Sequence, residues 1–253
     1  MKFGKKLKQQ MEESLPGWRS SFLSYKELKK HVKKVSSSPK MSDGAETFQF
    51  VRLLNGEIEK MNAFFLGKEE DFIIRHKELR RRIEMVSDVW GPNGSQPSEG
   101  SYRDEMGKIT IDIVDFHGEM VLLENYSSVN YTGLVKILKK YEKRTGCLLR
   151  FPYMQEVLRQ PFVVTDLVAK LVKECEGTID VVFPWEDEAR AGGSKGDGDG
   201  SLSGAGIFRN TLAALVTMQE IRRGSSTYNH LSLPPLDLSD LDFLQALHLT
   251  SAF

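Results

Sequence analysis

The chain has 253 residues, 40% of them hydrophobic, and its formal net charge is zero. This length can bury one core and carry additional segments. Two cysteines are too few for a disulfide framework, and no apolar run approaches the roughly 20 residues that span a bilayer. We therefore expect a soluble intracellular protein whose thiols are reduced and packed.

Charge is unevenly distributed along the sequence. Residues 1–40 carry eleven Lys or Arg against three Glu, whereas residues 186–253 carry nine acids against five bases. This asymmetry predicts a basic binding surface and an acidic tail.

The N-terminal residues, about 1–36, predict a helical hairpin. Apolar residues recur every three or four positions over residues 2–14, and Leu15-Pro16-Gly17 then turns the chain. The same spacing predicts a second helix from Trp18 to Val35, which a Ser/Pro run ends. Two such helices joined by a short turn pack as a hairpin.

Two long helical segments are predicted next. Apolar residues repeat every seven positions over about 46–89, and a helix of that length is roughly 65 Å long, so it needs long antiparallel partners. One partner is visible, with an apolar stripe formed by Met106, Ile109, Ile113, Phe116, Met120 and Leu123. Asn125 to Asn130 weakens this pattern, so a separate lysine-rich helix is predicted to begin near Tyr131.

The remaining segments predict an all-α fold. Arg150-Phe151-Pro152 breaks the chain, and a last bundle helix is predicted over about 163–175. The apolar run 179–183 is too short to establish a strand. The predicted architecture is an N-terminal helical hairpin packed on a bundle of long antiparallel helices, with a flexible C-terminal tail holding one short helix.

Composition sets the predicted domain boundaries. Residues 1–185 form the helical domain, in which the long bundle helices occupy about 45–175. Gly, Ser and Asp make residues 186–206 a flexible linker. Residues 207–253 hold one short amphipathic helix and a tail of apolar residues among Pro and Asp, which is typical of a short binding motif.

The most informative segment is the lysine run in the predicted helix that begins near Tyr131. On a helix its lysines share an arc of about 100°, opposite the apolar residues; they are Lys136, Lys139, Lys140 and Lys143. Their four like-charge pairs at i,i+3 or i,i+4 cost the unliganded helix on the order of 1–2 kcal/mol. A polyanion would reverse this cost, and rotatable ammonium groups can surround a compact ligand with many phosphates. The alternative is a solvated basic helix face.

The N-terminal hairpin repeats this design. Lys2, Lys5 and Lys6 fall in the first turn of a helix, where backbone N–H groups are unpaired and the helix dipole disfavours cations. Such a helix end favours a phosphate site over a structural role. Tyr25 and Lys29 are four residues apart and share one face, where a hydroxyl beside an ammonium can hold a phosphate oxygen. The alternative for Tyr25 is an aromatic side chain at the edge of the core.

Three separated motifs resemble one known family. They are Met1–Lys5 (MKFGK), Tyr25–Lys29 (YKELK) and Asn130–Lys143 (NYTGLVKILKKYEK). In this order, and with Pro161–Val164 downstream, they resemble the SPX domain over about residues 1–185. The segment Thr211–Pro235 is similar to the C-terminal region of plant stand-alone SPX proteins.

The resemblance implies a ligand and its contacts. SPX domains are helical bundles that bind inositol polyphosphates and pyrophosphates, so the expected ligand is inositol hexakisphosphate or an inositol pyrophosphate. No catalytic cofactor and no metal are expected. Carried over residue by residue, the ligand-contacting motif matches Lys2, Tyr25, Lys29, Lys136, Lys139, Lys140 and Lys143, with Lys5 and Lys33 as neighbours.

The resemblance also implies a partner. Plant stand-alone members, when loaded with ligand, bind MYB-type phosphate-starvation-response transcription factors and keep them off DNA. The implied protein is a non-enzymatic negative regulator of phosphate-starvation signalling. Its expected location is the nucleus, and an additional location in the cytoplasm stays open. It is expected to contact neither nucleic acid nor membrane directly. Whether its long helices exchange to form a homodimer stays open, as do the preferred inositol phosphate and the transcription factor.

Two other functions compete with this interpretation. The first is a basic helical module that binds nucleic acid directly; zero net charge, few arginines and the lack of a recognised nucleic-acid motif weigh against it. The second is an enzyme of inositol phosphate turnover. The five histidines are scattered, without the paired histidines of a metal site or the glycine pattern of a phosphate-binding loop.

Overall fold

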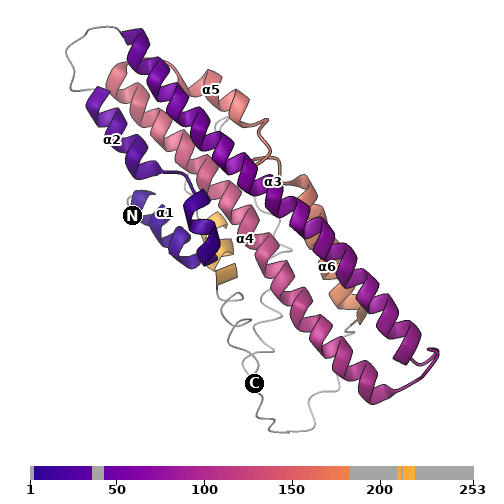
Figure 1. Cartoon of the computed structure of the whole chain (residues 1–253). Coiled ribbons are helices and arrows are strands. Elements are labelled where there is room, and N and C mark those ends of the chain that lie inside the picture. The colour runs from indigo at the N-terminus through magenta and orange to yellow at the C-terminus, as the bar shows by residue number, and fades with distance from the viewer. Residues whose placement is uncertain (1–2, 36–42, 183–209, 212, 220–253) are drawn as a thin grey trace. The chain divides into compact units, whose positions relative to one another are not determined.

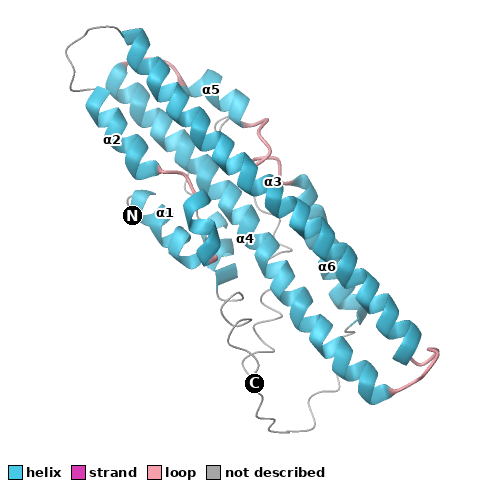
Figure 2. Cartoon of the chain, in the orientation of Figure 1, coloured by secondary structure: helices cyan, strands magenta, loops and turns pink. Residues whose placement is uncertain are grey.

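The protein is all-α, as the sequence predicts. The computed structural model describes residues 3–35, 43–182, 210–211 and 213–219. Its elements are α1 (Phe3–Glu13), the 3₁₀ helix η1 (Pro16–Ser21), α2 (Tyr25–Val35), α3 (Asp43–Trp90), α4 (Glu99–Thr145), α5 (Arg150–Val157) and α6 (Asp166–Val182) (Figure 1). In this described part Figure 2 shows helices and loops without a strand, and none of the helices is long and apolar enough to cross a membrane.

Two compact units share the long helices α3 and α4. The first unit comprises Met1–Gly67, Leu122–Thr165 and Leu212–Phe253, and the second comprises Lys68–Val121 and Asp166–Thr211. The first unit therefore contains the N-terminal hairpin, the start of α3 and the end of α4. All the described lysines of the predicted site lie in this unit.

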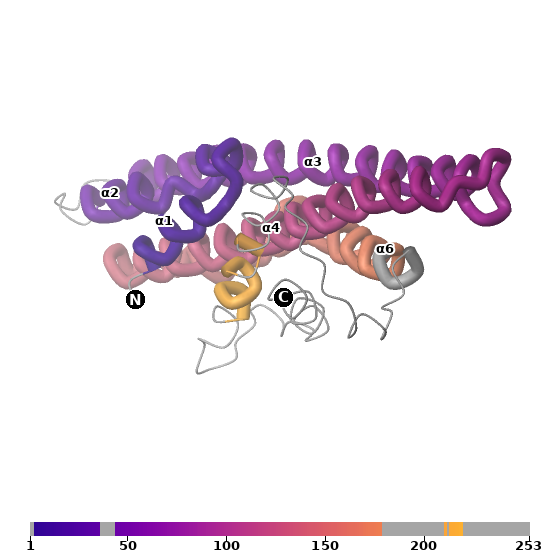
Figure 3. Tube along the Cα trace, turned by 90° about the horizontal axis from the view of Figure 1, so that it is seen from below, coloured from indigo at the N-terminus to yellow at the C-terminus, as the bar shows by residue number. Residues whose placement is uncertain are grey.

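Aromatic contacts show that α3 and α4 are antiparallel within the first unit. Near the start of α3, Phe50 stacks on Tyr141 with ring centroids 4.2 Å apart, and the Tyr141 hydroxyl lies 2.8 Å from Thr47 Oγ1. Further along, Phe64 meets Tyr126 at 4.9 Å. Residues later in α3 thus pair with residues earlier in α4, which confirms the predicted antiparallel arrangement. Figures 1 and 3 both place α2 alongside these two helices.

The second helix of the hairpin is interrupted, whereas one helix over 18–35 was predicted. The chain forms η1, then leaves the helix at Phe22, whose backbone is extended, and begins α2 only at Tyr25. Phe22 and Leu23 are both 2% exposed. The Phe22 carbonyl accepts a hydrogen bond from Lys60 at 2.9 Å, and the Ser24 N–H donates to Glu57 at 2.8 Å. Side chains of α3 replace the backbone partners that a continuous helix would supply.

The predicted interruption of α4 between Asn125 and Asn130 is wrong, because α4 continues through it to Thr145. Both asparagines are buried, and the hairpin supplies their partners: the Asn125 amide donates to Gln10 Oε1 at 2.8 Å. Polar residues that look like a helix break in the sequence are thus the points where the hairpin attaches. The helix ends before Gly146, whose φ of 76° suits the left-handed conformation that commonly follows a helix.

The later elements also differ in detail from the prediction. Arg150 begins α5 instead of breaking the chain, because Pro152 falls in the first turn, where its missing N–H is tolerated. The last bundle helix is α6, and it runs to Val182, so the described part of the 179–183 segment is helical.

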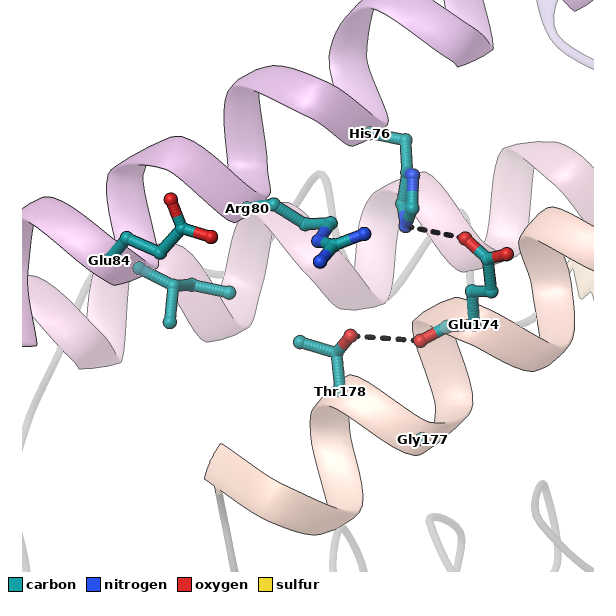
Figure 4. A pocket seen from close by; sticks show the side chains of 7 residues that line it. His76, Arg80, Glu84, Glu174, Gly177 and Thr178 are labelled. Carbon is teal, nitrogen blue, oxygen red and sulfur yellow. Dashed lines mark hydrogen bonds and ion pairs between the residues drawn. The ribbon is translucent and has the colours of Figure 1, made fainter.

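The second unit holds α6 against α3 and α4 through two buried histidines. His76 of α3 lies with Nε2 3.7 Å from a carboxylate oxygen of Glu174, and His117 of α4 lies 3.1 Å from Glu176. Between these glutamates, Cys175 is 2% exposed. Figure 4 shows His76 and Glu174 at the edge of a cavity of about 340 Å³, with Arg80, Glu84 and Thr178.

A short C-terminal helical segment adds to the core. Residues 210–211 and 213–219 are helical, and Leu215 and Met218 are 1% and 0% exposed. The predicted amphipathic helix therefore packs its apolar face, although it is too short to be stable alone. The predicted linker 186–206 lies outside the described residues, and the proposed domain boundaries stay a prediction.

Candidate polyanion-binding site

The C-terminal part of α4 has one apolar face and one basic face. Its apolar residues Leu134, Ile137, Leu138 and Tyr141 are at most 1% exposed. On the other side, Lys136, Lys139 and Lys143 are exposed and Lys140 is half-buried. The core therefore fixes the rotation of the helix, and this rotation directs the four lysines away from the core.

A glycine and an asparagine of α4 position the hairpin against this helix. Asn130 is completely buried; its side-chain oxygen accepts a hydrogen bond from the Leu23 N–H at 2.8 Å, and its amide donates to the Tyr126 carbonyl at 2.8 Å. One turn later, a Cβ on Gly133 would lie 2.5 Å from a methyl group of Leu23. Both residues allow the hairpin to approach α4 closely, so this part of the Asn130–Lys143 motif is structural.

The ring of Phe3 connects the first helix to the predicted ligand residues. Its centroid lies 5.1 Å from that of Tyr25, in an edge-to-face arrangement, and the Lys136 ammonium lies 5.6 Å above it. A cation over an aromatic face is stabilised by the ring quadrupole. Burial raises the pKa of the Tyr25 hydroxyl, so this group stays a hydrogen-bond donor at neutral pH.

Lys29 of α2 and Lys140 of α4 lie near each other. Burial lowers the pKa of the Lys140 ammonium, and the positive charges of Lys29 and Arg144 lower it further. Lys29 and Lys140 also line one cavity of about 550 Å³, together with Tyr25 and with Lys5 and Lys8 of α1. Two ammonium groups from different helices are thus held near each other, an arrangement that favours an anion between them.

No described carboxylate neutralises this surface. Lys29, Lys136, Lys139, Lys140 and Lys143 form no ion pair with an acidic side chain among the residues that the structure describes. Glu27 does line the cavity, but its carboxylate accepts a hydrogen bond from Lys30 at 2.8 Å. Within the described part of the chain, several positive charges therefore lie in one place without a compensating carboxylate.

The structure brings together four of the seven predicted ligand residues: Tyr25, Lys29, Lys136 and Lys140. Lys139 and Lys143 share the basic face of α4 through helical spacing and are exposed. Lys2 lies outside the described residues, directly before Phe3. Of the two predicted neighbours, Lys5 lines the cavity and Lys33 does not.

Sequence reasoning missed the residues that hold the site together. The sequence singled out Phe3, Asn130 and Gly133 only as members of motifs. Gly133 carried a usable signal, because a glycine inside an apolar helical pattern often marks a close approach of another segment.

Comparison with known proteins identifies the family. A sequence model of the SPX domain matches residues 1–47 and 87–157, and these segments contain all seven predicted ligand residues. "SPX domain-containing protein 3" of Arabidopsis thaliana is 53% identical over 253 residues, which cover 99% of this chain and 98% of the relative. The chain belongs to the SPX domain family. "SPX domain-containing protein 5" of Oryza sativa subsp. indica is 51% identical over 245 residues, covering 96% and 92%.

A solved structure shares the fold of this SPX protein. It is the SPX domain of Chaetomium thermophilum glycerophosphodiester phosphodiesterase 1 in complex with inositol hexakisphosphate, which is 25% identical and gives a TM-score of 0.54. The similarity covers 72% of this chain and 99% of that domain.

Proposed function

We propose that this SPX protein binds inositol hexakisphosphate or an inositol pyrophosphate on the surface formed by Lys29, Lys136, Lys139, Lys140 and Lys143. The observation that carries the proposal is the placement of Lys29 of α2 beside Lys140 of α4 on one cavity, without a neutralising acid among the described residues. Folding brings these like charges together at a cost in free energy, and a ligand with many phosphates offsets this cost. The inositol hexakisphosphate in the solved SPX domain of similar fold supports the same ligand class.

The ligand would join three helices. A phosphate held by Lys140 and Lys29 connects α4 to α2, and the cation above Phe3 places α1 next to the same surface. Because the Tyr25 hydroxyl stays protonated, it donates a hydrogen bond to phosphate without adding negative charge. Ligand binding should therefore rigidify the hairpin on α4 as well as neutralise the surface.

We further propose a protein partner. When loaded, the protein binds a MYB-type phosphate-starvation-response transcription factor and prevents it from binding DNA, so it acts in the nucleus as a non-enzymatic negative regulator. The electrostatic reason is that the lysine surface repels a basic partner until a polyanion lies between them. Ligand and transcription factor should each tighten the binding of the other by the same factor, as thermodynamic linkage requires.

Two measurements test the two steps separately. Calorimetry measures the binding of inositol hexakisphosphate, a pyrophosphorylated analogue and inositol hexakissulfate to wild type and to Lys140→Ala. The matched control is Lys77→Ala, which removes an exposed lysine of α3. Ligand binding that is lost in Lys140→Ala and kept in Lys77→Ala supports the site. Equal losses in both variants would instead indicate nonspecific charge attraction.

A DNA gel-shift then tests the partner step. The transcription factor, its DNA and this protein are titrated with ligand at fixed salt, and release of the factor from DNA should require ligand. If the factor leaves DNA equally well without ligand, the sensor mechanism is wrong even when the calorimetry succeeds. Salt-sensitive binding of this protein to DNA alone would favour the nucleic-acid alternative.

A further inference from the structure

Three large apolar side chains are exposed where α3 begins and α5 begins. Phe48 of α3 is 71% exposed, Leu148 before α5 is 84% exposed and Phe151 of α5 is 52% exposed. All three belong to the first unit. Single exposed apolar residues are common on proteins, but a group of them marks a binding surface. We call these three residues the apolar end patch.

Contacts between α3 and α5 place the three residues at the same end of these two helices. The Tyr153 hydroxyl donates to Asn55 Oδ1 at 2.8 Å, and the Asn62 amide donates to Gln160 Oε1 at 2.8 Å. Higher numbers in α5 therefore pair with higher numbers in α3, so the two segments run in the same direction. Phe48 lies seven residues before Asn55 and occupies the same stripe of α3. Leu148 and Phe151 correspondingly precede Tyr153, so the three apolar side chains lie at the same end.

Arginines lie near the patch on α3, α4 and α5. Arg52 follows Phe48 by one turn and is exposed, and Arg144 at the end of α4 is also exposed. Arg150 starts α5; its guanidinium lies 3.4 Å from Glu142, whose carboxylate also accepts the Arg150 backbone N–H at 2.7 Å. The Glu142 carboxylate is thus already engaged by Arg150. A ligand for this surface should combine apolar side chains with negative charge.

The C-terminal tail of the same chain has this chemistry. Residues 231–249 contain nine Leu or Phe and three Asp, without Lys or Arg. We propose that this tail docks in cis on the apolar end patch, with its leucines on Phe48, Leu148 and Phe151 and its aspartates toward the surrounding arginines. The docking surface contains none of the five lysines of the ligand site proposed above.

The chain is long enough for this docking. Leu215 and Met218 anchor the preceding helical segment by burial. From there, residues 220–235 can span about 55 Å when extended. The whole segment of α4 in the first unit, residues 122–145, is only about 35 Å long. The tail can therefore reach any level along that segment.

Competition between the attached tail and a free tail peptide tests the proposal. A fluorescent peptide of residues 231–249 is titrated with full-length wild type and with a full-length variant carrying Leu236→Ser, Leu238→Ser and Leu241→Ser. An attached tail has an effective concentration of about 1 mM, so a peptide with a Kd of about 0.1 mM should bind wild type about tenfold more weakly than the variant. Its affinity for the variant should also fall as salt rises, because aspartates meet arginines.

Patch substitutions locate the site. Leu148→Asp with Phe151→Asp in the tail variant should abolish peptide binding, whereas Ile111→Asp, at a position 58% exposed on α4, should not change it. Circular dichroism confirms that each variant is folded. Equal peptide binding by wild type and tail variant, absence of peptide binding, or binding that survives the patch substitutions would each overturn the proposal. Wild-type dimers that the tail substitutions convert to monomers would show docking on a second copy instead.

Discussion

Replacing Lys139 and Lys140 by alanine should weaken inositol hexakisphosphate binding and, at the same time, stabilise the free protein. Lys139 is exposed and Lys140 is half-buried, and both lie on the side of α4 opposite its buried residues. A loss of ligand binding through damage to the fold would lower stability. A loss through removal of ligand contacts should not, and this difference in sign makes the experiment decisive.

The magnitudes follow from the charges on α4. The double substitution removes all four like-charge pairs of the lysine run, which at a few tenths of a kcal/mol each gives about 1 kcal/mol. For a protein of this size, 1 kcal/mol corresponds to a rise of about 2–4 °C in melting temperature. One hydrogen bond to a charged group is worth about 1.5–3 kcal/mol, so ligand affinity should fall at least tenfold.

Thermal unfolding without ligand and calorimetry with inositol hexakisphosphate, both at one fixed salt concentration, measure the two effects. The matched control is Lys77→Ala with Arg81→Ala, which removes two exposed cations four residues apart on α3. This control should leave ligand affinity within about twofold of wild type, which is small on the free-energy scale of affinity. A lower melting temperature of the Lys139/Lys140 variant, or an unchanged affinity, would refute the reasoning.

Three further predictions concern the fold that supports the site. Gly133→Val should destabilise the protein by about 1–3 kcal/mol in urea unfolding and weaken ligand binding, because a Cβ would lie 2.5 Å from Leu23; full stability would show that the hairpin can shift. Leu215→Ala should cost about 2–5 kcal/mol of unfolding free energy, since Leu215 is 1% exposed, while ligand affinity stays within about twofold by calorimetry, because the lysine residues are untouched. Burial lowers the pKa of His76 below its ordinary 6.5, so the unfolded chain takes up the proton first and the folded state loses stability as pH falls below about 6.5. His76→Gln should reduce this loss of stability in urea unfolding measured at a series of pH values. A variant with the same pH profile as wild type would contradict the prediction.

The sequence by itself determined the fold class and the basic face of α4. Apolar spacing alone predicted the long antiparallel helices, because a helix of this length must bury a stripe along its whole extent. The same spacing determined that Lys136, Lys139, Lys140 and Lys143 point away from the core. These features are local, since each depends only on residues within a few turns of one helix.

The tertiary structure decided which helices meet and where they end. Asn125 and Asn130 reduce helix propensity locally, yet α4 continues through them because Gln10 and Leu23, more than 100 residues away, supply hydrogen-bond partners. The predicted helix over 18–35 is interrupted for the converse reason, since Glu57 and Lys60 satisfy the backbone of η1–α2 from outside. Propensity is a weak preference that such contacts override.

The proximity of Lys29 to Lys140 could likewise not be predicted from the spacing of residues. Each lysine could be assigned to the exposed face of its own helix, but their proximity depends on how closely the hairpin approaches α4. Gly133 sets that approach through the absence of a side chain, and Asn130 sets it through one buried hydrogen bond. A pattern of residue spacing describes the faces of one helix, whereas the distance between two helices is set by side-chain volume and by the pairing of buried polar groups.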